Sequence, residues 1–178
     1  MHRPPPRIYW DACAWIAYIN KEMPAPDNNI TRPRFEMCRD TLKRAESGDI
    51  EIVTSAFTLA EVCKRQADPA SPAINLAAFF DQKYILLVPV DKQIGLQAQH
   101  LQLAGIGRLK PPDAIHLASA LVANVPVFHT FDKGLLDLDK KLTLGEGGEM
   151  VIVRPTEEVP MPPLLEAMQP DDTEPKSD

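Results

Sequence analysis

The stretch PPDAIHLASALVANVPVFHTFD, residues 111–132, decides the fold class because it joins a helix to a buried strand that ends at an acid. The two prolines at its start favour the first turn of a helix, which we expect over 113–123. The apolar run 125–129 predicts a buried strand, and Asp132 follows the carboxyl end of that strand. Helices that alternate with buried strands are typical of α/β proteins.

The rest of the chain repeats this pattern of short apolar strands and helices. We expect further strands at 7–10, 51–54, 85–88 and 150–153, and helices at 12–19, 34–47, 55–66, 71–80 and 92–104. Strands that are apolar throughout are buried on both faces, which is typical of parallel sheets covered by helices. The sequence therefore predicts an α/β fold, a three-layer α/β/α sandwich with a mainly parallel sheet of four to five strands.

The chain divides into one domain and a tail. Its 178 residues match the size of one ordinary domain, which we place at 1–154. Residues 155–178 form an acidic, proline-rich tail that we expect to be disordered. Seven acids and one lysine in this tail account for the whole net charge of −6. The charges of 1–154 therefore balance, and a phosphate-backbone substrate is compatible with them.

Targeting signals and disulfides are not expected. No apolar run approaches the roughly 20 residues that span a bilayer, and the first residues lack the apolar region of a signal peptide. We therefore expect a cytoplasmic protein without membrane contact. Cys13, Cys38 and Cys63 form no CxxC pair and are odd in number, so we interpret them as reduced thiols rather than as disulfides or a structural zinc site.

Four acids lie near joints between predicted strands and helices, and they are Asp11, Glu61, Asp113 and Asp132. In a parallel sheet, groups at such joints gather beyond the carboxyl ends of the strands. Carboxylates about 4 Å apart repel one another unless they are protonated or bind a cation. Oxygen ligands suit a hard divalent ion, so the pattern favours a Mg²⁺ or Mn²⁺ site at this edge.

Each acid also has a purely structural interpretation. Asp11 is placed to cap the helix that follows it, and Thr58 to Glu61 matches a capping box. Asp113 is placed to complement a helix dipole, and Asp132 fits an ordinary turn. The common order of the four acids along one predicted edge favours the metal site over these separate interpretations.

Four segments together resemble the PIN domain, and most closely the VapC-like toxin nucleases. These segments are Ile8–Asp11, Thr54–Val62, Pro112–Ala120 and Thr130–Asp132, and the resemblance extends over residues 7 to 153. It implies that Asp11, Glu61, Asp113 and Asp132 form an acidic metal site that is both catalytic and metal-binding. It further implies an endoribonuclease that hydrolyses single-stranded or looped RNA with Mg²⁺ or Mn²⁺, an antitoxin protein as partner, and a homodimer.

Other residues near the four acids are candidates for supporting roles. Thr130 is a candidate to hydrogen-bond a metal-bound water, and His116 is a candidate to contact such a water or the substrate. A buried histidine with satisfied hydrogen bonds is the more ordinary interpretation of His116. Arg108 and Lys110 precede Asp113 and are placed to guide RNA. Family members often carry a hydroxyl or amide side chain just after the first aspartate, whereas Ala12-Cys13 stands here.

A different class of function remains open from the sequence. The chain could be a catalytically inactive PIN-like module that binds RNA or protein, with the acids kept for packing or partner contacts. Metal binding separates this alternative from the nuclease. Nucleotide-binding motifs such as GxGxxG and GxxxxGK[ST] do not occur, and Asp11-Ala12-Cys13 lacks the second aspartate of a DxD phosphatase.

Overall fold

The computed structural model describes residues 4–22, 32–63 and 76–155, and its centre is a five-stranded sheet. The strands are β1 (Arg7–Trp10), β2 (Glu51–Ser55), β3 (Ile85–Val88), β4 (Val127–His129) and β5 (Val151–Val153). Their order across the sheet is β3-β2-β1-β4-β5, and every neighbouring pair is parallel. The predicted parallel α/β fold is therefore confirmed.

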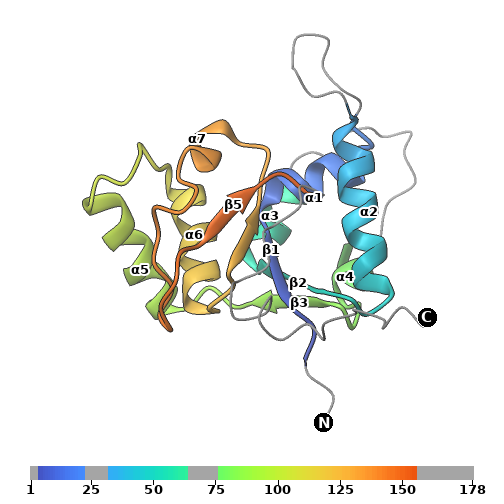
Figure 1. The fold of residues 1–178 in the computed structure, drawn as a ribbon, viewed down its shortest axis with the longest axis horizontal. Coiled ribbons are helices and arrows are strands. Elements are labelled where there is room, and N and C mark those ends of the chain that lie inside the picture. Colours follow the sequence, from blue (N-terminus) through green and yellow to red (C-terminus); the bar gives the residue numbers. More distant parts are fainter. Residues whose placement is uncertain (1–3, 23–31, 64–75, 156–178) are drawn as a thin grey trace, which may run out of the picture.

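Helices cover both faces of the sheet (Figure 1). On one face lie α1 (Ala12–Ile19), α2 (Arg34–Glu46), α3 (Phe57–Cys63) and α4 (Leu76–Phe80), and on the other α5 (Lys92–Leu103) and α6 (Pro111–Val122). Successive strand residues point to opposite faces. Trp10 of β1 therefore packs with α1 and α2, whereas Tyr9 packs with α5 and α6. Two apolar cores, one on each face, hold the sheet between them.

The connection order places a change of winding direction at the middle of the sheet. From β1 the chain proceeds to β2 and β3 on one side, and it then returns to add β4 and β5 on the other side. The direction of winding thus reverses between β1 and β4, the position where open α/β sheets bind ligands. Asp11 directly follows β1, and three residues separate β4 from α7 (Lys133–Leu136). The last of those three residues is Asp132.

Three local details differ from the sequence-based expectation. Strand β4 begins at Val127 rather than at Val125, because the Val125 amide donates to the Ala120 carbonyl and closes the end of α6. The single-turn helix α7 was not expected, and α3 begins at Phe57. The tail beyond Pro155 and residues 23–31 and 64–75 lie outside the described residues. No helix in the described ranges is long and apolar enough to cross a membrane.

Candidate active site

Asp11 is the most buried of the four acids. It caps the N-terminus of α1, where its Oδ1 accepts from the Ala14 amide at 3.1 Å, and only 4% of its surface is exposed. Burial raises the pKa of Asp11, while hydrogen bonds from Cys13, Thr130 and Ala14 lower it. The predicted capping role is therefore real, but capping uses only part of the bonding capacity of this carboxylate.

Thr130 connects Asp11 to the turn that carries Asp132. Its Oγ1 donates to Asp11 Oδ2 at 2.6 Å and accepts the Asp132 amide at 2.9 Å. The side chain is fully buried. A single hydroxyl thus fixes the turn after β4 relative to the carboxylate after β1.

Cys13 supports the same two segments. Its Sγ lies 2.9 Å from Asp11 Oδ1 and 3.3 Å from Thr130 Oγ1, and it accepts the Phe131 amide at 3.1 Å. Burial and the neighbouring Asp11 raise the pKa of this thiol well above its ordinary value, so the thiol is protonated and donates to Asp11. The thiol therefore occupies the place of the polar group that seemed missing from the sequence. Its spacing two residues after Asp11 was the available signal.

Asp113 and Asp132 approach each other from two different elements. Asp113 lies in the first turn of α6, and Asp132 caps α7 by accepting the Leu135 amide at 3.2 Å. Burial raises the pKa of Asp113, and the charge of Asp132 raises it further. Asp113 thus lies within reach of the Asp132 charge, and the backbone and charge of Lys110 offset part of the rise.

Glu61 lies on α3 and contacts a histidine of α6. Its Oε2 is 2.7 Å from His116 Nε2, and His116 is buried. The capping-box interpretation of Glu61 is wrong, because α3 already begins at Phe57 and Thr58 Oγ1 bonds with Thr54 Oγ1 at 2.8 Å. Glu61 is thus turned toward the helix that carries Asp113.

We call Asp11, Glu61, Asp113 and Asp132 the acidic edge. Among the described residues, Asp11, Asp113 and Asp132 form no ion pair with a lysine or arginine. Carboxylates that have no cationic partner supply the oxygen ligands and the negative charge that Mg²⁺ or Mn²⁺ prefers. No three histidine, cysteine or acidic side chains in the described ranges converge closely enough to hold a metal ion. A metal ion here would therefore keep several of its waters, as Mg²⁺ commonly does.

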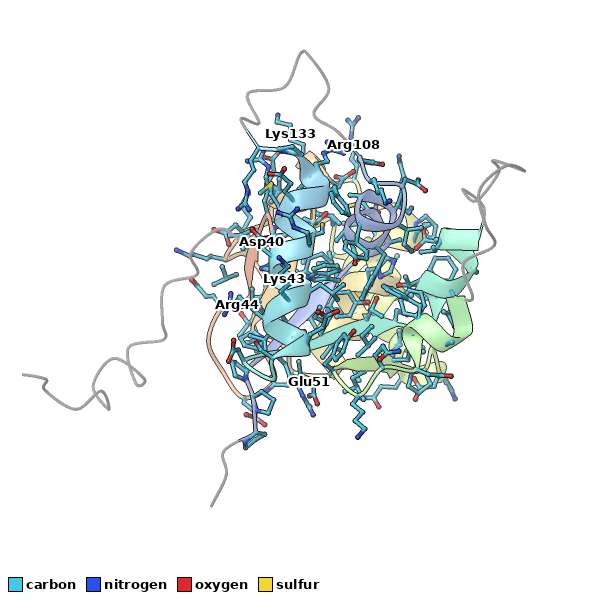
Figure 2. The ribbon with its side chains drawn as sticks, turned by 90° about the vertical axis from the view of Figure 1, so that its right-hand side faces the viewer. Asp40, Lys43, Arg44, Glu51, Arg108 and Lys133 are labelled. Carbon is cyan, nitrogen blue, oxygen red and sulfur yellow. The ribbon has the colours of Figure 1, made fainter. Side chains whose placement is uncertain are left out.

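Basic residues flank the acidic edge. Lys110 directly precedes α6, and its charge lowers the pKa of Asp113. Arg108 and Lys110 are both exposed. In Figure 2, Arg108 and Lys133 lie at the end of the molecule opposite to Glu51, which begins β2. Lys133, directly after Asp132, was not singled out from the sequence.

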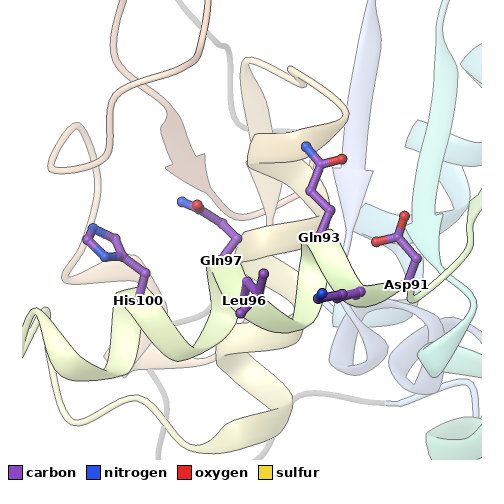
Figure 3. Close-up of a pocket in the computed structure, with 6 residues that line it drawn as sticks. Asp91, Gln93, Leu96, Gln97 and His100 are labelled. Atoms are coloured by element: carbon purple, nitrogen blue, oxygen red, sulfur yellow. The ribbon is translucent and has the colours of Figure 1, made fainter.

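An open hollow on the outer face of α5 is separate from the acidic edge (Figure 3). It is lined by Asp91, Lys92, Gln93, Leu96, Gln97 and His100. Asp91 is occupied there as the N-cap of α5, where it accepts the Ile94 amide at 3.0 Å. None of the four acids lines this hollow, so it does not bear on their chemistry.

Comparisons with known proteins identify the family and the fold of the chain. The family model described as PIN domain matches residues 8–141. The crystal structure of Mycobacterium tuberculosis VapC20, described as a sarcin-ricin loop cleaving toxin, matches with a TM-score of 0.51 and 18% sequence identity. That match covers 71% of this chain and 90% of the other. At this identity the structural match shows a shared fold alone. No curated protein matches the chain in sequence.

Proposed function

Because the chain belongs to the PIN domain family, we propose that it is a metal-dependent endoribonuclease and the toxin of a toxin–antitoxin pair. The observation that carries this proposal is the acidic edge itself. Asp11 follows β1, beside the point where the sheet reverses its winding, and the charge of Asp132 acts on Asp113. None of these three acids has a basic ion-pair partner among the described residues.

We infer that Asp11, Glu61, Asp113 and Asp132 hold Mg²⁺ or Mn²⁺. When bound, such an ion supplies an activated water and offsets the charge that develops on a phosphodiester. The chain's own residues set the geometry. Thr130 and Cys13 hold Asp11 and the Asp132 turn together, so these two carboxylates keep a fixed spacing at the site.

RNA is the proposed substrate. The structurally similar VapC20 is described as cleaving the sarcin-ricin loop, which favours single-stranded or looped RNA here as well. Arg108, Lys110 and Lys133 supply positive charge beside the acidic edge, where they would hold the phosphates on either side of the scissile bond. An antitoxin partner and a homodimer belong to the same proposal.

A cleavage assay on total RNA tests the proposed function. We expect cleavage with Mg²⁺ or Mn²⁺, none in excess EDTA, and restoration when the metal is returned. The Asp132→Asn protein, purified in parallel, controls for contaminating nucleases. An inactive RNA- or protein-binding module would cleave nothing under any of these conditions, and cleavage that persists in EDTA would refute the metal-dependent mechanism.

The ends of the products test the chemistry separately. If water attacks the phosphorus, the products carry 5′-phosphate and 3′-hydroxyl ends. They would then accept ligation through the 5′-phosphate. Products with 2′,3′-cyclic phosphates would show that the ribose hydroxyl attacks instead, and they would refute the hydrolytic mechanism.

A further inference from the structure

A buried chain of hydrogen bonds links the core of the sheet to Glu61. The Ser55 amide of β2 donates to Tyr9 Oη at 3.0 Å, and Tyr9 Oη lies 2.9 Å from His116 Nδ1. His116 Nε2 lies 2.7 Å from Glu61 Oε2. Tyr9, Ser55 and His116 are all buried, with His116 only 3% exposed, whereas Glu61 is half-buried. The chain therefore runs from the centre of the protein to the acidic edge.

We propose that His116 is a positioning residue that holds Glu61 at the metal site, and that Tyr9 fixes the orientation of the His116 ring. This inference rests on the proposed function. His116 need not touch the metal or the RNA, because both of its ring nitrogens already have partners within the protein.

The proton positions along this chain follow from what each group can donate. A carboxylate only accepts, so His116 Nε2 carries the proton of its contact with Glu61. The Tyr9 hydroxyl accepts the Ser55 amide and pairs with His116 Nδ1. Both ring nitrogens of His116 therefore have a partner in this orientation of the ring. The ring cannot flip without breaking two buried hydrogen bonds.

The neighbours of His116 restrict the ring further. Tyr9 packs edge-on against it with ring centroids 6.0 Å apart, and Phe57 of α3 does so with ring centroids 6.1 Å apart. Tyr9 is itself stacked on Phe128 of β4 at 4.9 Å. Aromatic packing and hydrogen bonds thus fix the ring together, which leaves one direction for Nε2 and one location for the Glu61 carboxylate.

A carboxylate held in this way has one oxygen left for a metal ion. Oε2 is occupied by His116, and no hydrogen bond to Oε1 occurs among the described residues. Groups that orient metal ligands are commonly worth about 10–100-fold in metal affinity, because a free ligand must first be ordered. His116 would supply that ordering for Glu61, the one acid of the edge that sits on a helix side rather than at a helix start.

A double-mutant cycle on Mn²⁺ binding tests the inference without RNA or catalysis. The free Mn²⁺ signal in electron paramagnetic resonance gives the dissociation constant of the metal-free, full-length protein. We expect His116→Leu to raise this constant by on the order of 10–100-fold, and His116→Gln, whose amide can still donate to Glu61, to recover most of the affinity. In a Glu61→Gln background, His116→Leu should have almost no further effect, because its effect passes through Glu61.

The controls separate positioning from simple loss of structure. Thr41→Val removes a buried hydroxyl that bonds only to the Met37 carbonyl of its own helix, so it should leave Mn²⁺ affinity unchanged. If His116→Leu fails to fold, Tyr9→Phe decides, and it should weaken Mn²⁺ binding in the same direction. A folded His116→Leu protein, or in its place a folded Tyr9→Phe protein, that binds Mn²⁺ like the wild type would overturn this inference alone, as would effects of His116→Leu that are additive with Glu61→Gln. Absence of Mn²⁺ binding by the wild type would overturn the proposed function along with it.

Discussion

Helix α2 and the acidic edge are both rich in charged side chains, yet their charges are arranged in opposite ways. Arg32, which precedes α2, pairs with Glu36 and Asp40, and Arg39 of α2 pairs with Asp40 at 3.4 Å. At the acidic edge, the charge of Asp132 raises the pKa of Asp113, and neither acid forms an ion pair with a described basic side chain. Glu36 and Asp40 are thus paired with bases within the protein, whereas Asp113 and Asp132 are not.

This difference separates acids that are paired with bases inside the fold from acids that are free to bind a cation. The pKa shifts of the two kinds of acid differ accordingly. The hydrogen bond and charge of Arg32 lower the pKa of Asp40 despite slight burial, whereas burial and the charge of Asp132 raise that of Asp113. Arg32, Arg34 and Arg39, which lie on or just before α2, are all paired with neighbouring acids. The unbalanced edge is where an external cation and a phosphate fit.

The largest expected effect is the loss of cleavage when the edge loses one charge. Asp11→Asn, Asp113→Asn and Asp132→Asn keep side-chain size and much of the capping ability. We expect each to lower kcat by at least on the order of 100-fold, since groups that merely orient metal ligands are worth about 10–100-fold. The metal-free stability of these variants, measured by urea unfolding, should be unchanged or raised, because repulsion is relieved.

The same substitutions have a clear contrary outcome. If Asp11 only caps α1, Asn should preserve cleavage, and Ala should cost about 1 kcal/mol of stability. Full metal-dependent cleavage by any one Asn variant would remove that residue from the catalytic set. If all three Asn variants and Glu61→Gln cleave fully, the acids of the acidic edge would be no more important for cleavage than those of α2.

A second, smaller effect is stabilisation by the metal. An ion that binds only the folded state should raise the free energy of unfolding by about 2.7 kcal/mol at roughly 100 times its dissociation constant. A thermal melt with and without Mn²⁺ measures this gain. Asp132→Asn should lose most of the gain, whereas Asp40→Asn on α2 should keep it. An equal gain in both variants would mean that the ion binds elsewhere.

The two surfaces should also respond to pH with opposite sign. The folded-state pKa of Asp113 is raised, so its ionisation lowers the free energy of unfolding of the metal-free protein at neutral pH. This loss of stability disappears as pH falls through the folded pKa. The folded-state pKa of Asp40 is lowered, so it contributes stability above its ordinary pKa that is lost as pH falls through the folded value.

Urea unfolding in EDTA from about pH 3 to 7 measures both differences. Asp113→Asn should be more stable than the wild type at neutral pH, and this advantage should shrink toward acid. Asp40→Asn should be slightly less stable at neutral pH, and this deficit should shrink below the ordinary pKa of aspartate. Parallel pH profiles for the two variants would contradict the proposed difference in their surroundings.

Periodicity and helix-start signals predicted most of the fold. Apolar runs located all five strands, and the paired prolines located the start of α6. The single-turn α7 was missed, because its four residues are too short to show a helical period. The aspartate that caps it was interpreted as an ordinary turn residue, since N-cap and turn preferences share the same residue types.

Pairwise contacts at the site were less accessible from the sequence. The order of the four acids predicted one edge, because strand ends share that edge in any parallel sheet. The contact between His116 and Glu61 joins residues 55 apart, and that between Tyr9 and His116 joins residues 107 apart. Such contacts depend on how α3 and α6 pack on the sheet, which local patterns do not encode. For this reason the capping box at Thr58 appeared plausible and proved wrong.

The smallest expected effect is that of breaking the balance on α2. Asp40→Asn removes the partner of Arg32 and Arg39 and leaves the acidic edge untouched. Side chains as exposed as these form ion pairs that are worth about 0.2–1 kcal/mol, because water and salt screen them. We therefore expect a stability loss within that range, smaller at high salt, and unchanged metal-dependent cleavage. Urea unfolding at low and high salt, with a cleavage assay alongside, measures both quantities. A large loss of cleavage with intact stability would mean that the α2 surface contacts RNA. Pairing of charges would then no longer distinguish a structural surface from a functional one.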